Sequence, residues 1–112
     1  MLIYKVLRAG EWAHLAANGT TRGAPVDVAD GYVHFSTAEQ LAETLRRHFA
    51  GETGVVVLAV DAEVVAPALR WEPSRGRALF PHLYRSLALA DVLWMRVLAD
   101  GADGPQPPDL AE

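Results

Sequence analysis

The chain has 112 residues, which suits one domain, and 51% of them are apolar, enough for an ordinary core. It contains no cysteine, which excludes a disulfide, a cysteine-ligated zinc site and a thiol nucleophile. The formal net charge of −4 argues against a general DNA- or RNA-binding role, because such proteins carry basic surfaces, and leaves open a local basic site around Arg46, Arg47, Arg70, Arg75 and Arg77.

The N-terminal run LIYKVL (residues 2–7) predicts a first strand, because several of its residues favour a pleated surface. The start of the chain shows neither a long apolar run nor a small-residue cleavage site, so we expect no signal peptide, and no apolar run is long enough to span a membrane. Together with the lack of cysteine, this predicts a cytoplasmic protein that binds neither DNA nor a membrane.

A helix and a long loop are expected next. Residues 10–18 (GEWAHLAAN) have apolar side chains at helical spacing and end before Gly19, a natural stop. Residues 19–31 show no periodicity and contain Gly, Pro and Asp, so we expect a loop. Loops of that length in a small domain often have a function.

The stretch GYVHFSTAEQL (residues 31–41) predicts a short strand that leads directly into a helix. His34 and Ser36 share one face of that strand, because side chains alternate. The pattern from Ser36 to Glu39 fits a capping box, in which the serine hydroxyl caps the helix. Gly51 is the expected C-terminal stop of this helix.

The second half of the chain predicts mostly strands. Residues 54–60 (GVVVLAV) indicate a central strand buried on both faces. A short helical turn is expected from Asp61 until Pro67 ends it. Residues 69–72 and 90–99 predict two further strands, and the segment ALFPHLYRSL between them is irregular or a short strand.

Residues 100–112 (DGADGPQPPDLAE) are rich in Pro, Gly and Asp, which predicts a disordered tail after a single domain of residues 1–99. Helices are expected early and strands late in the chain. This order favours an α+β fold over a doubly wound sheet.

His34 has two readings. A single histidine in a strand is more often packed or hydrogen-bonded than functional. However, His34 and Ser36 lead to a helix N-terminus, where free backbone N–H groups bind phosphate or carboxylate. For Ser36 and Thr37 capping is the stronger explanation, although a capping hydroxyl can still donate its proton to a ligand.

The segment RWEPSRGRALFPHLY (residues 70–84) is the second candidate. Arg70 and Glu72 lie on one strand face, and the plain explanation is an exposed pair over a buried Trp71. His82 and Tyr84 follow a proline in a segment that either packs on the core or holds site residues, which loops on a scaffold often do.

The sequence gives little support for a metal site or for a Ser-His-Asp catalytic triad. The four histidines form no H-x-H, H-x3-H or H-E-x-x-H pattern, so no metal site is predicted. There is also no G-x-S-x-G nucleophile elbow, no G-x-G-x-x-G fingerprint and no P-loop.

The motifs GYVHFSTAEQL, RRHFAG, RWEP and LFPHLY, in this order, resemble those of small bacterial proteins grouped as domain of unknown function 952. The resemblance covers about residues 2–98. It implies a fold similar to the ADP-ribosylation superfamily, a split, bent sheet here with two N-terminal helices. That superfamily includes toxins and RNA 2′-phosphotransferases that use NAD.

By that resemblance His34 contacts the ribose of NAD, with Ser36 beside it. The late glutamate of the toxins is missing, because the strand at residues 90–99 contains Asp91 as its only acid, so Glu72 would have to replace it. The implied catalytic residues are His34, Glu72 and His82, and the implied ligand-binding residues are Ser36, Thr37, Arg70 and Tyr84.

Three hypotheses follow. The first is a cleft for NAD or an ADP-ribose-like nucleotide, with transferase or glycohydrolase activity. The second is a non-catalytic ligand-binding or regulatory module on the same fold, which the missing glutamate favours. The third is a structural or interaction domain. They differ in whether His34, Glu72, His82 and Tyr84 converge on one concave surface.

Overall fold

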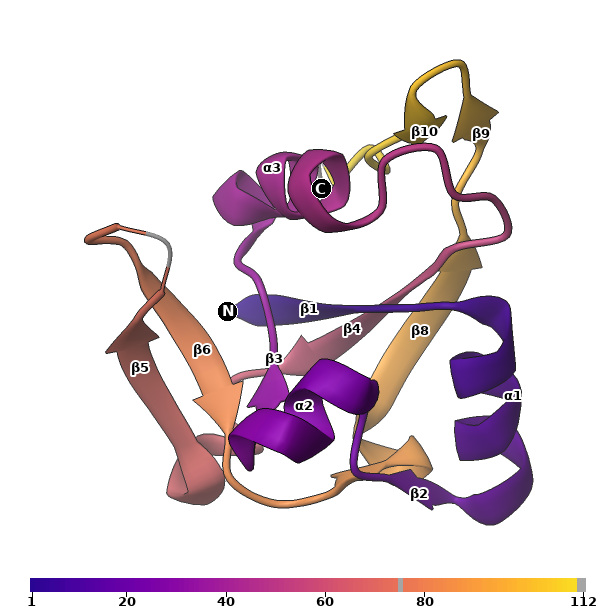
Figure 1. Cartoon of the computed structure of the whole chain (residues 1–112). Coiled ribbons are helices and arrows are strands. Elements are labelled where there is room, and N and C mark those ends of the chain that lie inside the picture. Colours follow the sequence, from indigo (N-terminus) through magenta and orange to yellow (C-terminus); the bar gives the residue numbers. More distant parts are fainter. Residues whose placement is uncertain (75, 111–112) are drawn as a thin grey trace.

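The computed structural model describes residues 1–74 and 76–110. Its helices are α1 (Ala9–Asn18), α2 (Pro25–Asp30) and α3 (Ala38–His48), with 3-10 turns η1 (Ala66–Ala68) and η2 (Leu89–Asp91). Its strands are β1 (Leu2–Leu7), β2 (Thr20–Thr21), β3 (Val33–His34), β4 (Val56–Asp61), β5 (Leu69–Pro73), β6 (Leu79–Leu83), β7 (Leu87–Ala88), β8 (Val92–Val97), β9 (Asp100–Gly101) and β10 (Gly104–Pro105). This mixture confirms the predicted α+β class (Figure 1).

The central sheet has the order β1-β4-β8, with both outer strands antiparallel to β4. The run Val56–Val60 is buried throughout, which confirms the prediction of a central strand covered on both faces. On one face, Leu58 packs with Leu15 of α1 and with the second sheet. On the other face, Val57 packs with Leu41 and Leu45 of α3, which lies across the sheet.

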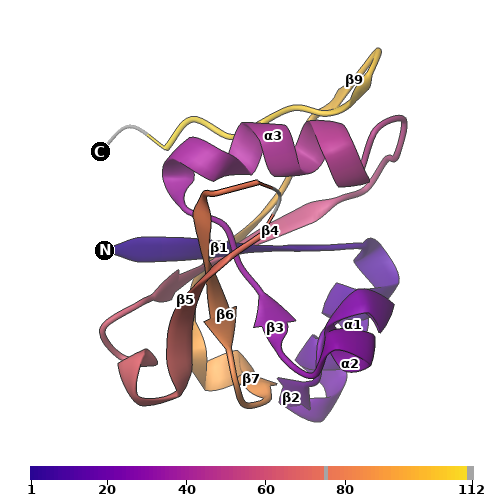
Figure 2. The ribbon, with the colours of Figure 1, turned by 60° about the vertical axis from the view of Figure 1, so that its left-hand side comes forward.

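The second sheet has the order β3-β6-β5 and is also antiparallel. It is joined to the first by a bridge at which Tyr4 of β1 and Ser36 exchange backbone hydrogen bonds of 2.8 and 2.9 Å. Both views place α3 and α2 on opposite sides of β1 (Figure 2). The outer edge of β1 is therefore the meeting point of both sheets and two helices.

The loop expected at residues 19–31 is only partly a loop, because it contains β2 and α2. Proline at the first position of α2 is favourable, since its missing N–H would have no partner there. The helix ends at Gly31, whose φ of 87° suits glycine. Six residues are too few for an apolar period to be visible, so three helices form where two were expected.

The predicted cap of α3 is wrong by one residue. Thr37 Oγ1 accepts a hydrogen bond from the Gln40 backbone N at 3.3 Å, and Gln40 Oε1 accepts one from the Thr37 backbone N at 3.0 Å. Ser36 is still extended, because it pairs with Tyr4, and its Oγ lies 2.8 Å from Thr44 Oγ1 instead. Strand pairing thus delays the helix start.

Other differences are local. Residues 62–65 form a turn, and Pro67 lies inside η1 rather than ending a helix. The segment around Pro81 is a regular strand, β6, because its partner β5 pairs with it residue by residue. Residues 100–105 form the β9–β10 hairpin where composition predicts disorder, and residues 111 and 112, like Arg75, lie outside the described residues.

Among the described residues, none of the helices is long and apolar enough to cross a membrane.

The burial of β4 gives a direct stability test. Leu58→Ala should lower the free energy of unfolding by about 2–5 kcal/mol, because it removes a fully buried side chain between both layers. Leu93→Ala on β8 is the matched control, since Leu93 is 58% exposed, and should change stability by less than about 0.5 kcal/mol. Urea unfolding measures both, and equal losses would contradict this picture of the core.

Candidate functional site

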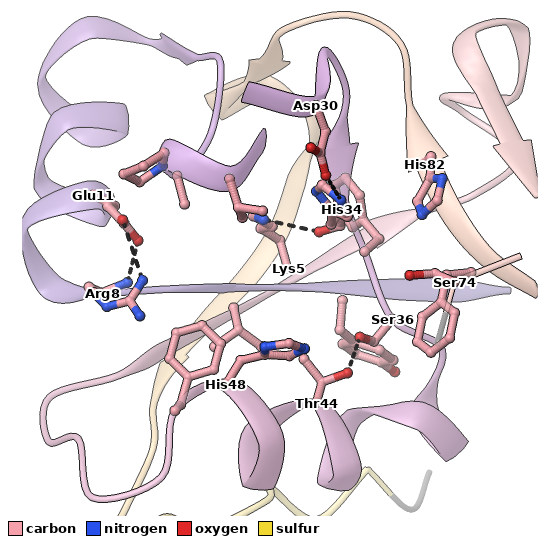
Figure 3. A pocket seen from close by; sticks show the side chains of 18 residues that line it. Lys5, Arg8, Glu11, Asp30, His34, Ser36, Thr44, His48, Ser74 and His82 are labelled. Atoms are coloured by element: carbon pink, nitrogen blue, oxygen red, sulfur yellow. Dashed lines mark hydrogen bonds and ion pairs between the residues drawn. The ribbon is translucent and has the colours of Figure 1, made fainter. Parts of the chain in front are cut away.

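A pocket of about 680 Å³ lies at the free edge of β1, between α2, α3 and the β5–β6 hairpin. Figure 3 shows His34 and His82 on one side of it, His48 and Thr44 on the other, and Lys5 on β1 between them. Aromatic and aliphatic side chains supply much of the remaining surface, together with the polar side chains of Arg8, Glu11, Asp30, Ser36 and Ser74. The pocket therefore combines an apolar wall with several nitrogen-bearing side chains.

His34, at the end of β3, is held between two carboxylates of α2. Its Nδ1 lies 2.6 Å from Asp27 Oδ1 and its Nε2 lies 3.0 Å from Asp30 Oδ2. The backbone N of His34 also donates to Asp27 Oδ1 at 2.9 Å. Both the position and the ring orientation of His34 thus depend on α2, the helix that sequence periodicity does not reveal.

Asp27 is fully buried and forms an ion pair with Lys5, whose Nζ lies 2.8 Å from Asp27 Oδ2. Burial favours the protonated acid, but the hydrogen bond from His34 and the charge and hydrogen bond of Lys5 outweigh it, so the pKa of Asp27 falls to about 2. Burial lowers the pKa of Lys5, and the Asp27 charge opposes that change. Lys5 Nζ also donates to the backbone O of His34 at 3.0 Å.

His82, on β6, has a carboxylate partner of its own. Its Nδ1 lies 2.9 Å from Glu72 Oε1, and the Tyr84 hydroxyl donates to the same oxygen at 2.7 Å. The hydrogen bonds from Tyr84 and then His82 lower the pKa of Glu72, and the bond to Glu72 raises the pKa of Tyr84. His82 is only 1% exposed, and its Nε2 is buried without a hydrogen-bond partner in the described structure.

Aromatic contacts hold these rings in place. The Tyr32 ring stacks on His82 with centroids 4.2 Å apart and lies 4.6 Å from His34. The His34 and His82 rings meet edge to face at 5.2 Å. Tyr84 packs against Tyr32 at 5.1 Å and carries the Arg70 guanidinium over its own ring at 4.7 Å.

Strand register explains why the predicted residues meet. His34, His82 and Arg70 are cross-strand partners, so their side chains share one face of the second sheet. Glu72 lies two residues from Arg70 on β5, which puts it on that same face. Tyr84 lies just beyond β6, and its contacts with Glu72 and Arg70 place it there as well. The opposite face holds Val33 and Leu83, which belong to the core.

The predicted residues therefore divide into groups. His34, Ser36 and His82 line the pocket. Glu72 contacts His82 and Tyr84 contacts Glu72, and neither lines the pocket, while Arg70 stacks on Tyr84. Thr37 caps α3 and is not among the lining residues. The predicted catalytic and ligand-binding roles of all seven stay predictions.

Sequence reasoning missed Lys5, Asp27, Asp30 and Tyr32. Tyr32 had a signal, because it lies two residues before His34 and so shares its strand face. Asp27 and Asp30 had none, since they lie in an apparent loop. The described residues contain no group of three or more histidine, aspartate or glutamate side chains that could hold a metal ion.

The fold and the pocket define a small α+β domain with a histidine-lined cavity at the junction of two sheets. The chain belongs to the family described as protein of unknown function (DUF952), whose profile matches residues 6–95. This confirms the family that the motifs predict.

The chain is similar to protein CC0527 from Caulobacter crescentus. Its crystal structure is 47% identical in sequence, with a TM-score of 0.91 over 95% of this chain and 94% of that chain. Its solution NMR structure is 46% identical, with a TM-score of 0.83 over 95% and 90% of the two chains. No curated protein matches the chain.

The buried ion pair predicts a large effect of Asp27→Asn. The substitution removes the countercharge of buried Lys5 and should lower the free energy of unfolding by about 3–5 kcal/mol. In the wild type, the pKa of Asp27 is depressed from 3.8 to about 2, so its contribution is present above pH 3.8 and is lost as the pH falls toward 2.

Urea unfolding at pH 7, 4 and 2.5 measures both effects. Asp27→Asn should flatten the dependence of stability on pH in the acid range, because that group no longer titrates. Asp103→Asn, at an exposed aspartate, is the control and should follow the wild type. An Asp27→Asn protein as stable as the control at pH 7 would contradict the role assigned to the pair.

Proposed function

We propose that the pocket binds a small ligand that carries a ribose and a phosphate, of the NAD or ADP-ribose class. The observation that supports this most is His82, which lines the pocket and whose Nε2 atom is buried without a hydrogen-bond partner among the described residues. An unpaired buried polar atom costs free energy, and a ligand hydroxyl would provide the missing partner.

Lys5 supports the phosphate part of the proposal. An ammonium group has three donors, and two of them bond Asp27 and the backbone O of His34. Lys5 also lines the pocket, so its third N–H is available to an anionic oxygen. A phosphate at this position would approach a cation that is already fixed in place.

The size and surface of the pocket fit such a ligand. Its volume of about 680 Å³ is within the range of sites for small organic ligands and cofactors. The rings of Tyr4, Phe49 and Phe80 line it and offer apolar surface to a base. Apolar surface with a small number of polar groups is the usual composition of a small-molecule site.

NAD as ligand, and transferase or glycohydrolase activity on it, follow from the proposed likeness to the ADP-ribosylation superfamily. One observation favours the alternative of binding without turnover. Strand β8 carries no acidic residue, and Glu72 has both close contacts to Tyr84 and His82 through its Oε1. Glu72 then serves to orient His82 rather than to stabilise an oxocarbenium-like centre.

Isothermal titration with NAD and ADP-ribose tests the proposal. Both should bind, and His82→Ala should weaken binding by about tenfold, since one hydrogen bond to the ligand is lost. His14→Ala, at a histidine on α1 outside the pocket, should bind as the wild type does. If neither NAD nor ADP-ribose gives a heat of binding at millimolar concentration, this ligand class is ruled out. Nicotinamide release from NAD separates turnover from binding alone.

A further inference from the structure

We propose that His82 and His34 form a proton acceptor and proton donor pair for transesterification of a small ribose phosphodiester, in which a ribose 2′-hydroxyl attacks the neighbouring phosphorus. This inference rests on the proposed function, because the ligand ribose must lie against His82. It adds a reaction class and two distinct roles to a site otherwise described only by what it binds. The two rings lie 5.2 Å apart, within reach of one bound group.

The contacts of His34 make it the proton donor. Both ring nitrogens face carboxylate oxygens, of Asp27 and Asp30, and an ionised carboxylate only accepts hydrogen bonds. Both contacts are hydrogen bonds only when both nitrogens carry protons, which is the imidazolium form. The charged groups that contact His34 are these two aspartates of α2 and Lys5 of β1, and the His82 ring lies beside it.

The contacts of His82 make it the proton acceptor. Its Nδ1–H donates to Glu72, which fixes the tautomer and leaves a lone pair on Nε2. No other group in the described structure occupies Nε2. The Tyr84 hydroxyl and the stacked Tyr32 ring restrict movement of Glu72 and His82. His34 thus has a carboxylate at each ring nitrogen, whereas His82 has one at Nδ1 alone.

In the proposed step, His82 Nε2 takes the proton of the 2′-hydroxyl, and the 2′-oxygen forms a new bond to phosphorus. The substrate displaces the Asp30 carboxylate from Nε2 of His34. The bond from phosphorus to the 5′-oxygen of the next nucleoside breaks, and that oxygen takes the Nε2 proton of His34. The products are a 2′,3′-cyclic phosphate and a free 5′-hydroxyl. Exchange with water returns a proton to His34 and removes one from His82.

Two further features support this reaction class. The Oγ atoms of Ser36 and Thr44 bond each other at 2.8 Å, and the chain has no cysteine, so a nucleophile carried by the substrate suits the pocket. The remaining N–H of Lys5 can stabilise charge on a non-bridging phosphate oxygen. Acid, base and cation together are what this displacement needs.

The test uses uridylyl-(3′,5′)-adenosine as substrate and follows adenosine and uridine 2′,3′-cyclic phosphate by liquid chromatography. The wild type should release both in equal amounts. His34→Ala and His82→Ala should lose about 100-fold or more in rate. His14→Ala should retain the wild-type rate. Added imidazole should partly restore His82→Ala, which a merely structural defect would not allow.

Glu72→Gln covers the case in which His82→Ala does not fold, because Glu72 is at the edge of the site and partly exposed. As a positioning residue, Glu72 should affect kcat with little change in KM, and we expect a loss of at least about tenfold in kcat. An unchanged kcat in Glu72→Gln would overturn the assignment of His82 as the base.

The 2′-deoxy dinucleotide, which cannot react, separates the two proposals. If it binds but the ribose substrate is not cleaved, the acid–base inference is wrong and the binding function stands. If wild type and both histidine variants cleave equally, the activity is a contaminant and the inference is also wrong. If neither the deoxy dinucleotide, NAD nor ADP-ribose binds, the proposed function itself fails.

Discussion

The buried carboxylate of Asp27 connects three segments of the chain, which are β1, the start of α2 and β3. Its Oδ2 accepts from Lys5 Nζ on β1 and from the Ala24 backbone N at the start of α2, and its Oδ1 accepts from the backbone N and ring Nδ1 of His34. Gly23 makes room for it, because a Cβ there would collide with the Asp27 side chain. One side chain thus caps a helix, neutralises a buried lysine and orients a pocket histidine.

A small protein has few buried side chains, so the several roles of Asp27 matter for its structure. A buried ion pair is rarely worth more than an apolar replacement, so its retention at a pocket wall is better explained by the geometry it imposes. With four hydrogen bonds, Asp27 has little freedom to move, and His34 inherits that rigidity. Tyr32, Glu72 and Tyr84 do the same for His82 from the other side. Both histidines are therefore oriented before a ligand arrives, which lowers the cost of binding.

Much of this site could be predicted from the sequence, because strand alternation is a local rule. His34 and Ser36 share a face by spacing alone, and so do Arg70 and Glu72. The pairing of β3 with β6, which makes His34 and His82 neighbours, depends on long-range contacts that no local pattern shows. Asp27 was hidden for another reason: α2 has one buried residue, a polar one, so it lacks the apolar period by which helices are recognised. The cap of α3 was displaced because the bridge to Tyr4 keeps Ser36 extended.

The difference between the two histidines arises from their carboxylates rather than from the rings. His34 has a carboxylate at each nitrogen, whereas His82 has one, at Nδ1, and an unpaired Nε2. Neighbouring imidazoles of identical chemistry thereby have different hydrogen-bond partners. Of the two aspartates that contact His34, Asp30 is the exposed one, and it contacts the ring only at Nε2. Movement of Asp30 would therefore free that nitrogen. In the proposed reaction, a ligand that displaces Asp30 would contact the donor His34 on one side and the acceptor His82 on the other. Ligand binding would then also expose the proton that the reaction needs.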